Sequence, residues 1–154
     1  MVELDKFIKI FEGLTSAYGQ TIKTDQFSEK GKHKTKSFTI SNPVTKKLWR
    51  EHLEGKDPAL GIVPINKENK CKWGCIDIDT YPFDHKKFIQ KLKEKNIPMI
   101  VCRSKSGGAH AFLFTKEFVP ATVMRVKLKL IASAMGFAGV EIFPKQDYIR
   151  VDRG

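Results

Sequence analysis

The chain has 154 residues, and its 41% of hydrophobic and 10% of aromatic residues suffice for one packed domain, which excludes global disorder. Lysine and arginine number 28 against 17 aspartate and glutamate residues, which gives a formal net charge of +11. A domain this basic usually meets an anionic partner, so nucleic acid or nucleotide is the first candidate, ahead of a basic surface that serves only solubility.

The first third of the chain is predicted to hold two helices on either side of a polar segment. Apolar residues at helical spacing predict a first helix over residues 3–14. Residues 19–36 are polar and basic, and we expect them to form a loop or a mobile arm whose charges are mainly solvated. A second helix is predicted over residues 43–53, with Pro43 in its first turn. The apolar run 60–65 predicts a short strand.

From residue 73 onward, strands and helices are predicted in the order β-α-β-β-α-β. The strands cover 73–78, 98–102, 109–114 and 140–143, and the helices cover 84–95 and 120–135, with Gly136 as a C-cap. The turn over 104–108 is so short that the strands beside it should be antiparallel. A further strand is expected to begin within 148–151.

This order is typical of the ferredoxin-like or RRM-like fold. We therefore predict an α/β (α+β) protein with an RRM-like core over residues 70–154.

The segment Cys-Ile-Asp-Ile-Asp-Thr places two carboxylates, Asp77 and Asp79, at the end of an apolar strand. Alternate residues of a strand share one face, so both carboxylates project together while Ile76 and Ile78 point into the core. Neighbouring carboxylates repel each other unless a cation lies between them, and Mg²⁺ or Mn²⁺ takes such ligands together with substrate phosphates. The alternative is a polar strand face that leads into a turn, because an Asp-x-Asp pair alone is a weak signal.

Residues 103–110, Arg-Ser-Lys-Ser-Gly-Gly-Ala-His, combine glycines with positive charge. Glycines let backbone amides approach an anion, and Arg103 and Lys105 add charge for phosphates. His110 begins the next strand, from which it can donate to a phosphate oxygen. The spacing differs from that of a Walker A loop, and the alternative is an ordinary hairpin turn with a surface histidine.

A third carboxylate, Glu141, lies between two apolar residues of a predicted strand and so faces away from them. In isolation it fits a polar strand face, and the nearby Lys145 and Arg150 fit either a solvated turn or contacts to phosphate or template. In the ferredoxin-like order, however, the strands of the aspartates and of His110 are central neighbours, and the strand of Glu141 flanks the first. The three signals are then expected to converge on one face of the sheet.

Three motifs in this order and spacing, WGCIDIDTY, RSKSGGAH and EIFPKQD, resemble those of the archaeo-eukaryotic primase superfamily. The resemblance is closest to the primase-polymerases of phages and mobile elements, including the primase domains of TOTE-type conflict systems. It covers residues 43–154, because the segment KKLWREHLEGKDPALGIVPI also looks like the one that precedes the acidic motif there. Related sequences continue beyond a stretch like VDRG, so we expect this chain to be part of a longer protein.

The resemblance implies that Asp77 and Asp79 are ligands for Mg²⁺ or Mn²⁺, with Glu141 as the third acidic ligand and Asp147 as the fallback. His110 ends the family's small-residue-x-His motif and is expected at the incoming triphosphate. The expected catalytic set is Asp77, Asp79, His110 and Glu141. The expected nucleotide-binding residues are Arg103, Ser104, Lys105, Ser106, Gly107, Gly108, His110 and Lys145.

The resemblance also implies a single catalytic domain over residues 1–154, in which residues 1–65 form an N-terminal α/β element joined to the RRM-like core. We therefore expect a DNA primase-polymerase domain that joins NTP or dNTP to a 3′-hydroxyl on a DNA template, in replication or primer synthesis. Expected partners are single-stranded DNA template, primer and nucleotide, with a helicase or C-terminal domains of the same protein as further candidates. One alternative is a non-catalytic RRM-like nucleic-acid-binding module, which Phe112 and Phe114 would suit. Another is a metal-dependent nuclease or replication-initiator nickase, which usually needs a paired-histidine motif that the sequence lacks.

The cellular location follows from the cysteines and the N-terminus. Cys71, Cys75 and Cys102 form an odd set, and the amphipathic N-terminus resembles neither a signal peptide nor a membrane span. We expect reduced thiols, no membrane association and a cytoplasmic location in a bacterium, an archaeon or a phage-infected host.

Overall fold

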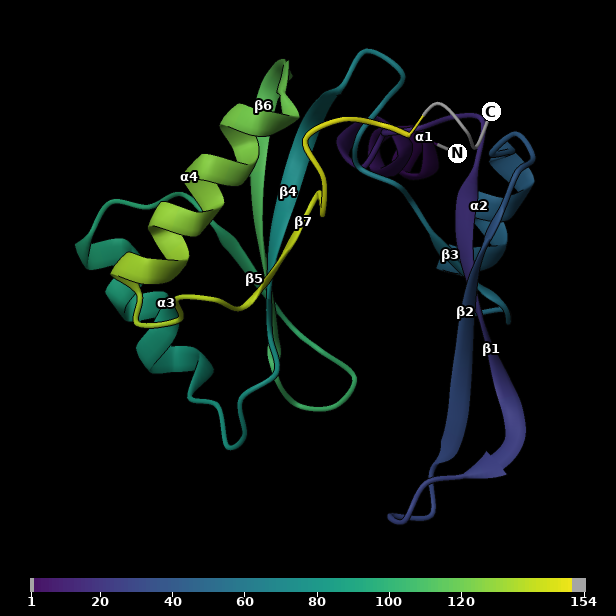
Figure 1. Ribbon diagram of the computed structural model, residues 1–154, viewed down its shortest axis with the longest axis horizontal. Helices are drawn as coiled ribbons and strands as arrows, with labels where there is room; N and C mark the ends of the chain where they lie inside the picture. Colours follow the sequence, from purple (N-terminus) through teal and green to yellow (C-terminus); the bar gives the residue numbers. More distant parts are fainter. Residues whose placement is uncertain (1, 151–154) are drawn as a thin grey trace. The chain divides into compact units, whose positions relative to one another are not determined.

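Residues 2–150 are described in a computed structural model, and they divide into two units. One unit is built from the residues up to Val63, together with Arg150, and the other spans Pro64–Ile149 (Figure 1). Helices and antiparallel sheets in the two units make the chain an α+β protein, as the sequence predicted. No helix within residues 2–150 is long and apolar enough to cross a membrane.

The second unit is built on a four-stranded antiparallel sheet in the order β5-β6-β4-β7. Its strands are β4 (Lys70–Ile78), β5 (Ile100–Arg103), β6 (Ala109–Pro120) and β7 (Glu141–Phe143), and its helices are α3 (His85–Glu94) and α4 (Ala121–Ala134). Both helices lie on the same face of the sheet (Figure 1). The central pair is β4 and β6, which confirms the ferredoxin-like order that the sequence predicted.

Side chains along β4 point alternately to the two faces of the sheet, and the apolar ones decide which face the helices cover. Ile76 and Ile78 are fully buried in one core cluster with Leu128 of α4, while Asp77 between them points to the opposite face. Gly74 keeps the helix close to the strand, since a Cβ there would lie 2.7 Å from Leu128 Cδ1. The apolar core therefore lies between sheet and helices, and the other face of the sheet is left for polar and aromatic side chains.

The helices of the second unit begin and end where their caps place them. The side chain of Asp84 accepts a hydrogen bond from the amide of Lys87 (3.0 Å) and caps α3. Gly136 follows the C-cap of α4 with φ of +84°, the conformation that favours glycine at this position. Both predicted helices are confirmed with small shifts of their ends.

The strands of the second unit differ from prediction at their ends. β6 extends well past residue 114, to Pro120, and β7 begins at Glu141 rather than one residue earlier. The strand expected within 148–151 is wrong for residues 148–150, which form a bend and coil, and Val151 lies outside the described residues. The backbone amide of Ile149 is instead bound by the side chain of Asn69 (2.7 Å).

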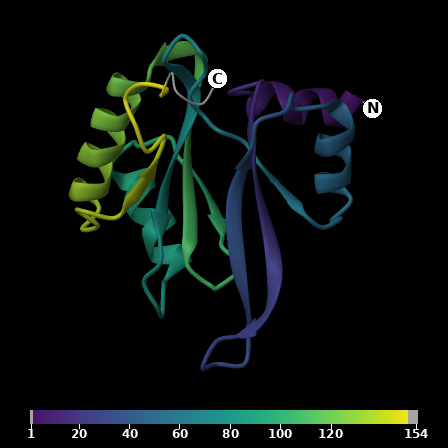
Figure 2. The ribbon, with the colours of Figure 1, turned by 45° about the vertical axis from the view of Figure 1, so that its right-hand side comes forward.

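The first unit has a three-stranded antiparallel sheet in the order β2-β1-β3. Its elements are α1 (Val2–Ile10), β1 (Tyr18–Phe27), β2 (His33–Ile40), α2 (Lys46–Leu53) and β3 (Ala59–Gly61). β1 and β2 form a long hairpin (Figure 2), so the prediction of a loop or mobile arm over residues 19–36 is wrong. Beyond its base the hairpin is exposed on both faces, so its sequence lacks the apolar alternation that marks a half-buried strand.

Tertiary contacts shorten the other predicted elements of this unit. α1 ends at Ile10 rather than at residue 14, since the amide of Leu14 is bound by the carbonyl oxygen of Val63 (2.9 Å). A Cβ on Gly13 would collide with that same oxygen, so glycine is required at this crossing.

The second helix and the following strand also begin or end differently from prediction. Thr45 caps α2 through its hydroxyl, which accepts from the amide of Leu48 (3.3 Å), so Pro43 precedes the helix instead of forming its first turn. Of the strand predicted over residues 60–65, only the start is found, in β3.

Gly108 offers a test of the packing between β4 and β6, because a Cβ there would overlap the carbonyl oxygen of Ile78. We expect Gly108→Ala to lower the free energy of unfolding by about 1–3 kcal/mol, because the rigid backbone of β4 has to shift. Gly19→Ala is the matched control, since its Cβ would meet Gly61 at an ordinary 3.6 Å. Urea denaturation of both variants measures the effect, and equal stabilities would contradict the close contact.

Candidate metal and nucleotide site on the open sheet face

The strand register brings three of the predicted site residues into one row on the open face of the sheet. Asp77 on β4 pairs directly with His110 on β6 and with Glu141 on β7. On the outer side of His110, the same row continues with Cys102 of β5. The side chains of directly opposed residues in an antiparallel sheet lie about 5 Å apart at Cβ. The convergence that the sequence predicted is therefore present for these three residues.

Asp77 lies at the centre of this row in an unfavourable environment. Its Oδ1 atom is buried and accepts no hydrogen bond from any described residue, although His110 Nε2 lies 3.4 Å away. Burial raises the pKa of Asp77, and the negative charges of Asp79 and Glu141 raise it further, against a weaker opposing effect of His110 and Lys145. A buried anionic oxygen without a hydrogen bond is a suitable ligand for a cation.

Asp79 lies one residue beyond the end of β4, where it is exposed to solvent. The hydroxyl of Tyr81 donates to its Oδ1 (3.1 Å) and also lies 2.7 Å from the Ser106 hydroxyl. Ser106 in turn lies 3.4 Å from the hydroxyl of Ser104. Hydrogen bonds thus connect the second aspartate to the turn between β5 and β6.

Sequence reasoning missed Tyr81 and His85, which both bind this turn. The spacing of Tyr81, two residues beyond Asp79, was the available signal, because an extended segment repeats its direction every second residue. His85 Nε2 lies 2.8 Å from the carbonyl oxygen of Gly108. No sequence pattern pointed to His85, because it is the first residue of a helix that approaches the turn only through tertiary packing.

The turn Ser104–Gly108 is closed by its own backbone. The amide of Ser104 donates to the carbonyl oxygen of Gly108 and the amide of Gly107 to that of Ser104, both at 3.0 Å. Gly107 adopts φ of +98°, which only glycine tolerates well. The amides of Lys105 and Ser106 donate to no described residue. The two glycines therefore shape the turn, and these two amides are available to an anion.

The predicted basic residues are placed in different surroundings. Arg103 neighbours Cys102 along β5 and pairs with the buried Ala109, so the register puts it on the face opposite His110. Lys145 lies 2.6 Å from Glu141 Oε1 and 5.0 Å from the ring centre of Phe143, so it neutralises one carboxylate of the row. Lys105 is exposed in the turn.

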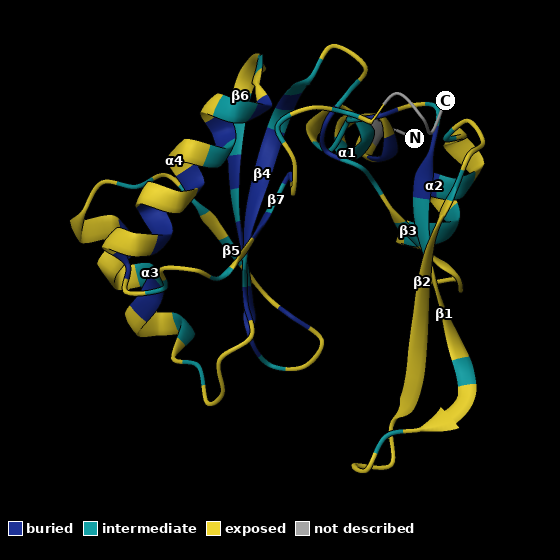
Figure 3. Cartoon of the chain, viewed as in Figure 1, coloured by how far each residue is buried: buried dark blue, intermediate teal, exposed yellow. Residues whose placement is uncertain are grey.

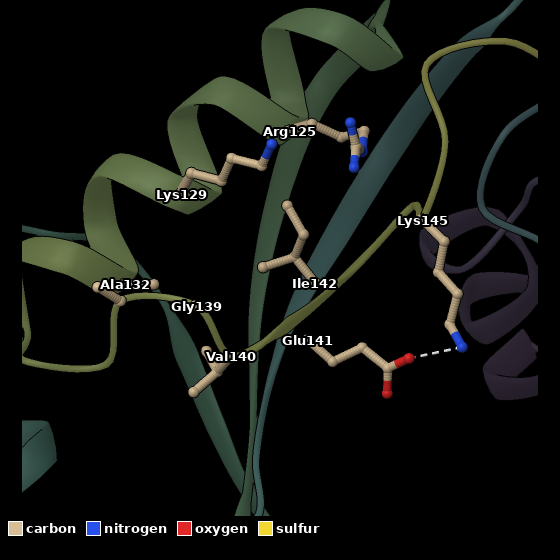
Figure 4. Close-up of a pocket in the computed structure, with 9 residues that line it drawn as sticks. Arg125, Lys129, Ala132, Gly139, Val140, Glu141, Ile142 and Lys145 are labelled. Atoms are coloured by element: carbon tan, nitrogen blue, oxygen red, sulfur yellow. Dashed lines mark ion pairs between the residues drawn. The ribbon is translucent and has the colours of Figure 1, made fainter.

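A pocket of about 550 Å³ lies between α4 and β7, at the edge of the sheet (Figure 4). Arg125 and Lys129 of α4 contribute positive charge to its wall, while Glu141 and Lys145 point away from the helix. The pocket therefore adjoins the row only at Glu141 and does not contain Asp77.

Asp147, the fallback for the third carboxylate, is held by Arg125 at 2.9 Å. The same guanidinium donates to the carbonyl oxygen of Pro144 at 3.1 Å. Asp147 is therefore tied to the edge of the sheet at α4, which favours Glu141 as the third acid. Within residues 2–150, no three histidine, cysteine, aspartate or glutamate side chains are gathered closely enough to hold a metal ion by themselves. Substrate oxygens would have to complete a coordination shell, as is usual for Mg²⁺.

Comparison with known proteins gives one informative match. The family model described as the archaeo-eukaryotic primase domain of the TOTE conflict system matches residues 6–153, almost the whole chain. No curated protein matches significantly.

The position of Asp77 predicts that its charge destabilises the metal-free protein. In the presence of a chelator at neutral pH, Asp77→Asn should raise the free energy of unfolding by about 0.5–2 kcal/mol. Because the pKa of Asp77 is raised on folding, its contribution is most favourable below its unfolded pKa of about 3.9 and is lost as pH rises through the folded value. Thermal melts should therefore show a difference that appears as pH increases above about 4 and then levels off.

Mn²⁺ should reverse the order of stability of the wild type and Asp77→Asn. Added Mn²⁺ should raise the melting temperature of the wild type. At a hundredfold excess over the dissociation constant, it should add about 2.7 kcal/mol to the free energy of unfolding. Asp77→Asn should gain much less, because the amide is a weaker ligand. Identical melts of the two proteins at every pH, with and without Mn²⁺, would contradict a strained carboxylate at this position.

Proposed function

Since the chain belongs to the archaeo-eukaryotic primase domains of TOTE conflict systems, we propose that it is a metal-dependent DNA primase-polymerase domain. The reaction is attack of a primer or initiating 3′-hydroxyl on the α-phosphate of NTP or dNTP, with release of pyrophosphate. The observation that carries this proposal is the buried Oδ1 of Asp77, without a hydrogen bond, between His110 and Glu141. A purely structural carboxylate would be expected to have a hydrogen-bond partner.

Asp77 and Asp79 are the proposed ligands for Mg²⁺ or Mn²⁺, with Glu141 as the third acid. When bound, the ion neutralises phosphate charge and orients the attacking and leaving oxygens. Glu141 is exposed and paired with Lys145, so it can exchange its ammonium partner for another cation at low cost. The buried Oδ1 of Asp77, by contrast, has only the His110 ring, at 3.4 Å, as an ion-pair partner among the described residues. Asp77 is therefore the residue whose loss should matter most.

The turn Ser104–Gly108 and His110 are the proposed binding residues for the triphosphate. The amides of Lys105 and Ser106, which donate to no described residue, and the ammonium of Lys105 present positive charge in the turn that leads into the strand of His110. His110 has about half of its side chain exposed and can donate a ring N–H to a phosphate oxygen. Gly107 and Gly108 contribute the turn geometry, and Lys145 adds charge beside Glu141.

A specific observation favours nucleic-acid binding on the same face. Phe112 and Phe114 of β6 are half-buried and stacked, with ring centres 6.0 Å apart and planes at 24°. The buried Trp73 of β4 supports them, with its ring centre 6.1 Å from that of Phe112. The two phenylalanine rings beside the charged row suit a stacked base. They also support the second candidate function, a non-catalytic RRM-like binding module, which would need no metal.

In the cell, the proposed partners are a single-stranded DNA template and a primer, and the proposed role is primer synthesis or replication for a phage or mobile element. A helicase or further domains of the same protein are candidate partners, and a cytoplasmic location is consistent with these substrates.

Primer extension tests the proposed reaction and separates it from the binding module. Asp77→Ala/Asp79→Ala should lower extension of a primer on single-stranded DNA in Mn²⁺ by about a thousandfold or more, because both proposed ligands are lost. Glu94→Ala/Glu117→Ala, which removes two exposed carboxylates elsewhere in the unit, should be unaffected. Circular dichroism checks that both variants fold, and full-rate extension by the double aspartate variant would disprove the site.

Tyr81 is proposed as a positioning residue, because its hydroxyl joins Asp79 to Ser106 in the turn Ser104–Gly108, which is proposed to bind the triphosphate. Tyr81→Phe removes only that hydroxyl, and we expect KM for the nucleotide to rise about 3–10-fold with a smaller change in kcat. The Mn²⁺ concentration needed for half-maximal rate should also increase. Tyr148→Phe, an exposed tyrosine outside this network, serves as the control. Unchanged KM and Mn²⁺ dependence would show that the hydroxyl has no such role.

A further inference from the structure

The β1–β2 hairpin is long and almost uncovered. Every residue from His33 to Thr39 is exposed, and so are most of those from Thr21 to Phe27 (Figure 3). A two-stranded ribbon that buries little apolar surface gains little stability from packing. No hydrophobic core therefore constrains which residue types the hairpin carries, and their chemistry indicates what kind of molecule this surface binds.

That chemistry is strongly basic near the tip. Lys30, Lys32, Lys34 and Lys36 lie within seven residues, and none of them forms an ion pair with a described carboxylate. The hairpin's other lysine, Lys23, is the only one that does, with Asp57 at 3.8 Å. The hairpin also carries two carboxylates, Asp25 and Glu29, so its five lysines leave a net positive charge. Cations in excess on one ribbon repel each other, and an anion that lies against them relieves this repulsion.

Aromatic rings accompany these cations. Phe27 is 57% exposed and lies against the His33 ring, with centres 4.3 Å apart. Phe38 is also exposed, and it shares one face of β2 with Lys36 and Lys34 because alternate residues point the same way. Phe27, which pairs with His33, lies on the opposite face of the ribbon. An exposed ring in line with cations on one strand face suits single-stranded nucleic acid, which proteins bind through base stacking and phosphate contacts.

Local hydrogen bonds give the tip a defined shape. Between Lys23 and Phe27, the register of β1 shifts against β2, which forms a bulge. The Thr24 hydroxyl donates to the carbonyl oxygen of Lys34 (3.0 Å), and His33 Nδ1 lies 2.9 Å from the carbonyl oxygen of Thr24. Such a bulge turns the tip relative to the base, and it leaves the lysines in fixed positions along the ribbon.

We propose that the β1–β2 hairpin is a binding arm for single-stranded nucleic acid. Lys34 and Lys36 contact phosphates and Phe38 stacks against a base on one face of β2, and Lys30 and Lys32 add phosphate contacts at the tip. The contacts read no sequence, because phosphates and ring faces are common to all strands. The inference rests on the proposed function only in that it takes the bound strand to be a template.

Salt-dependent binding tests this arm. The probe is a fluorescein-labelled oligothymidylate of about 30 nucleotides, titrated by anisotropy between about 50 and 200 mM KCl. Lys30→Gln/Lys32→Gln/Lys34→Gln/Lys36→Gln should weaken binding at least about tenfold at the higher salt. It should also reduce the slope of log K against log salt by about 2–3, because each lost phosphate contact on a single strand contributes about 0.7.

The matched control removes the same charge from exposed lysines of the other unit, by Lys86→Gln/Lys87→Gln/Lys91→Gln/Lys95→Gln. For this control, the slope of log K against log salt should differ from the wild-type slope by less than about 1. Lys→Arg at the four hairpin positions should keep wild-type binding, which excludes loss of folding as the cause. Equal weakening of the hairpin and control variants, or no binding by the wild type, would overturn the proposal.

Phe38→Ala tests the stacking contact separately. It should weaken binding about tenfold without changing the salt slope, because it removes a ring and no charge. Phe27→Ala, on the opposite face of the ribbon, is the matched control and should bind as the wild type does. Equal affinities of the two variants would restrict the arm to phosphate contacts and overturn the stacking part of the proposal.

The same proteins separate this inference from the proposed reaction. With EDTA in place of Mn²⁺, the wild type should bind the oligonucleotide equally well, because the arm needs no catalytic metal. If the wild type fails to extend primers but the hairpin lysines still carry DNA binding, the arm stands and the primase proposal falls. If extension is normal and the hairpin variant binds like its control, the primase proposal stands and the arm proposal falls.

Discussion

The carboxylate of Asp77 is the constraint on which the arrangement of the second unit depends. β4 must be apolar on one side to bury Ile76 and Ile78 under the helices, and the same strand places Asp77 at the centre of the other side. A central strand has a neighbour on each side, so the residues opposite Asp77 on both are within reach of it. His110 and Glu141 occupy those two positions. The buried oxygen between them remains unfavourable for the protein alone, and a bound cation would relieve that strain.

Much of the second unit could be predicted because its elements obey periodic patterns. The alternation in β4, the helical spacing in α4 and the short turn after β5 each have one dominant explanation, and together they fix the strand order. The row of Asp77, His110 and Glu141 then follows from topology. Tyr81 and His85 could not be found in this way, because their contacts with Ser106 and Gly108 depend on how chain segments approach each other in space.

The β1–β2 hairpin, by contrast, could not be predicted from periodic patterns. Residues 19–36 lack an apolar face, which predicts a loop or a mobile arm, and that prediction fails for a ribbon that is exposed on both faces. Threonines at positions 21, 24, 35 and 39 and Ile22 were the available signals, since β-branched residues favour strands regardless of burial. Register could not be deduced either, because the bulge between Lys23 and Phe27 depends on hydrogen bonds from Thr24 and His33.

The contact between Gly108 and the Ile78 carbonyl has a thermodynamic consequence. Ile78 separates the two aspartates, and Gly108 closes the turn proposed for the triphosphate, so the two proposed ligands would lie on either side of one close backbone contact. If the metal ion and the nucleotide each favour one arrangement of this contact, each must tighten the binding of the other by the same factor. The two ligands would then bind as a cooperative pair, and the free energy of that coupling would depend on the missing side chain at Gly108.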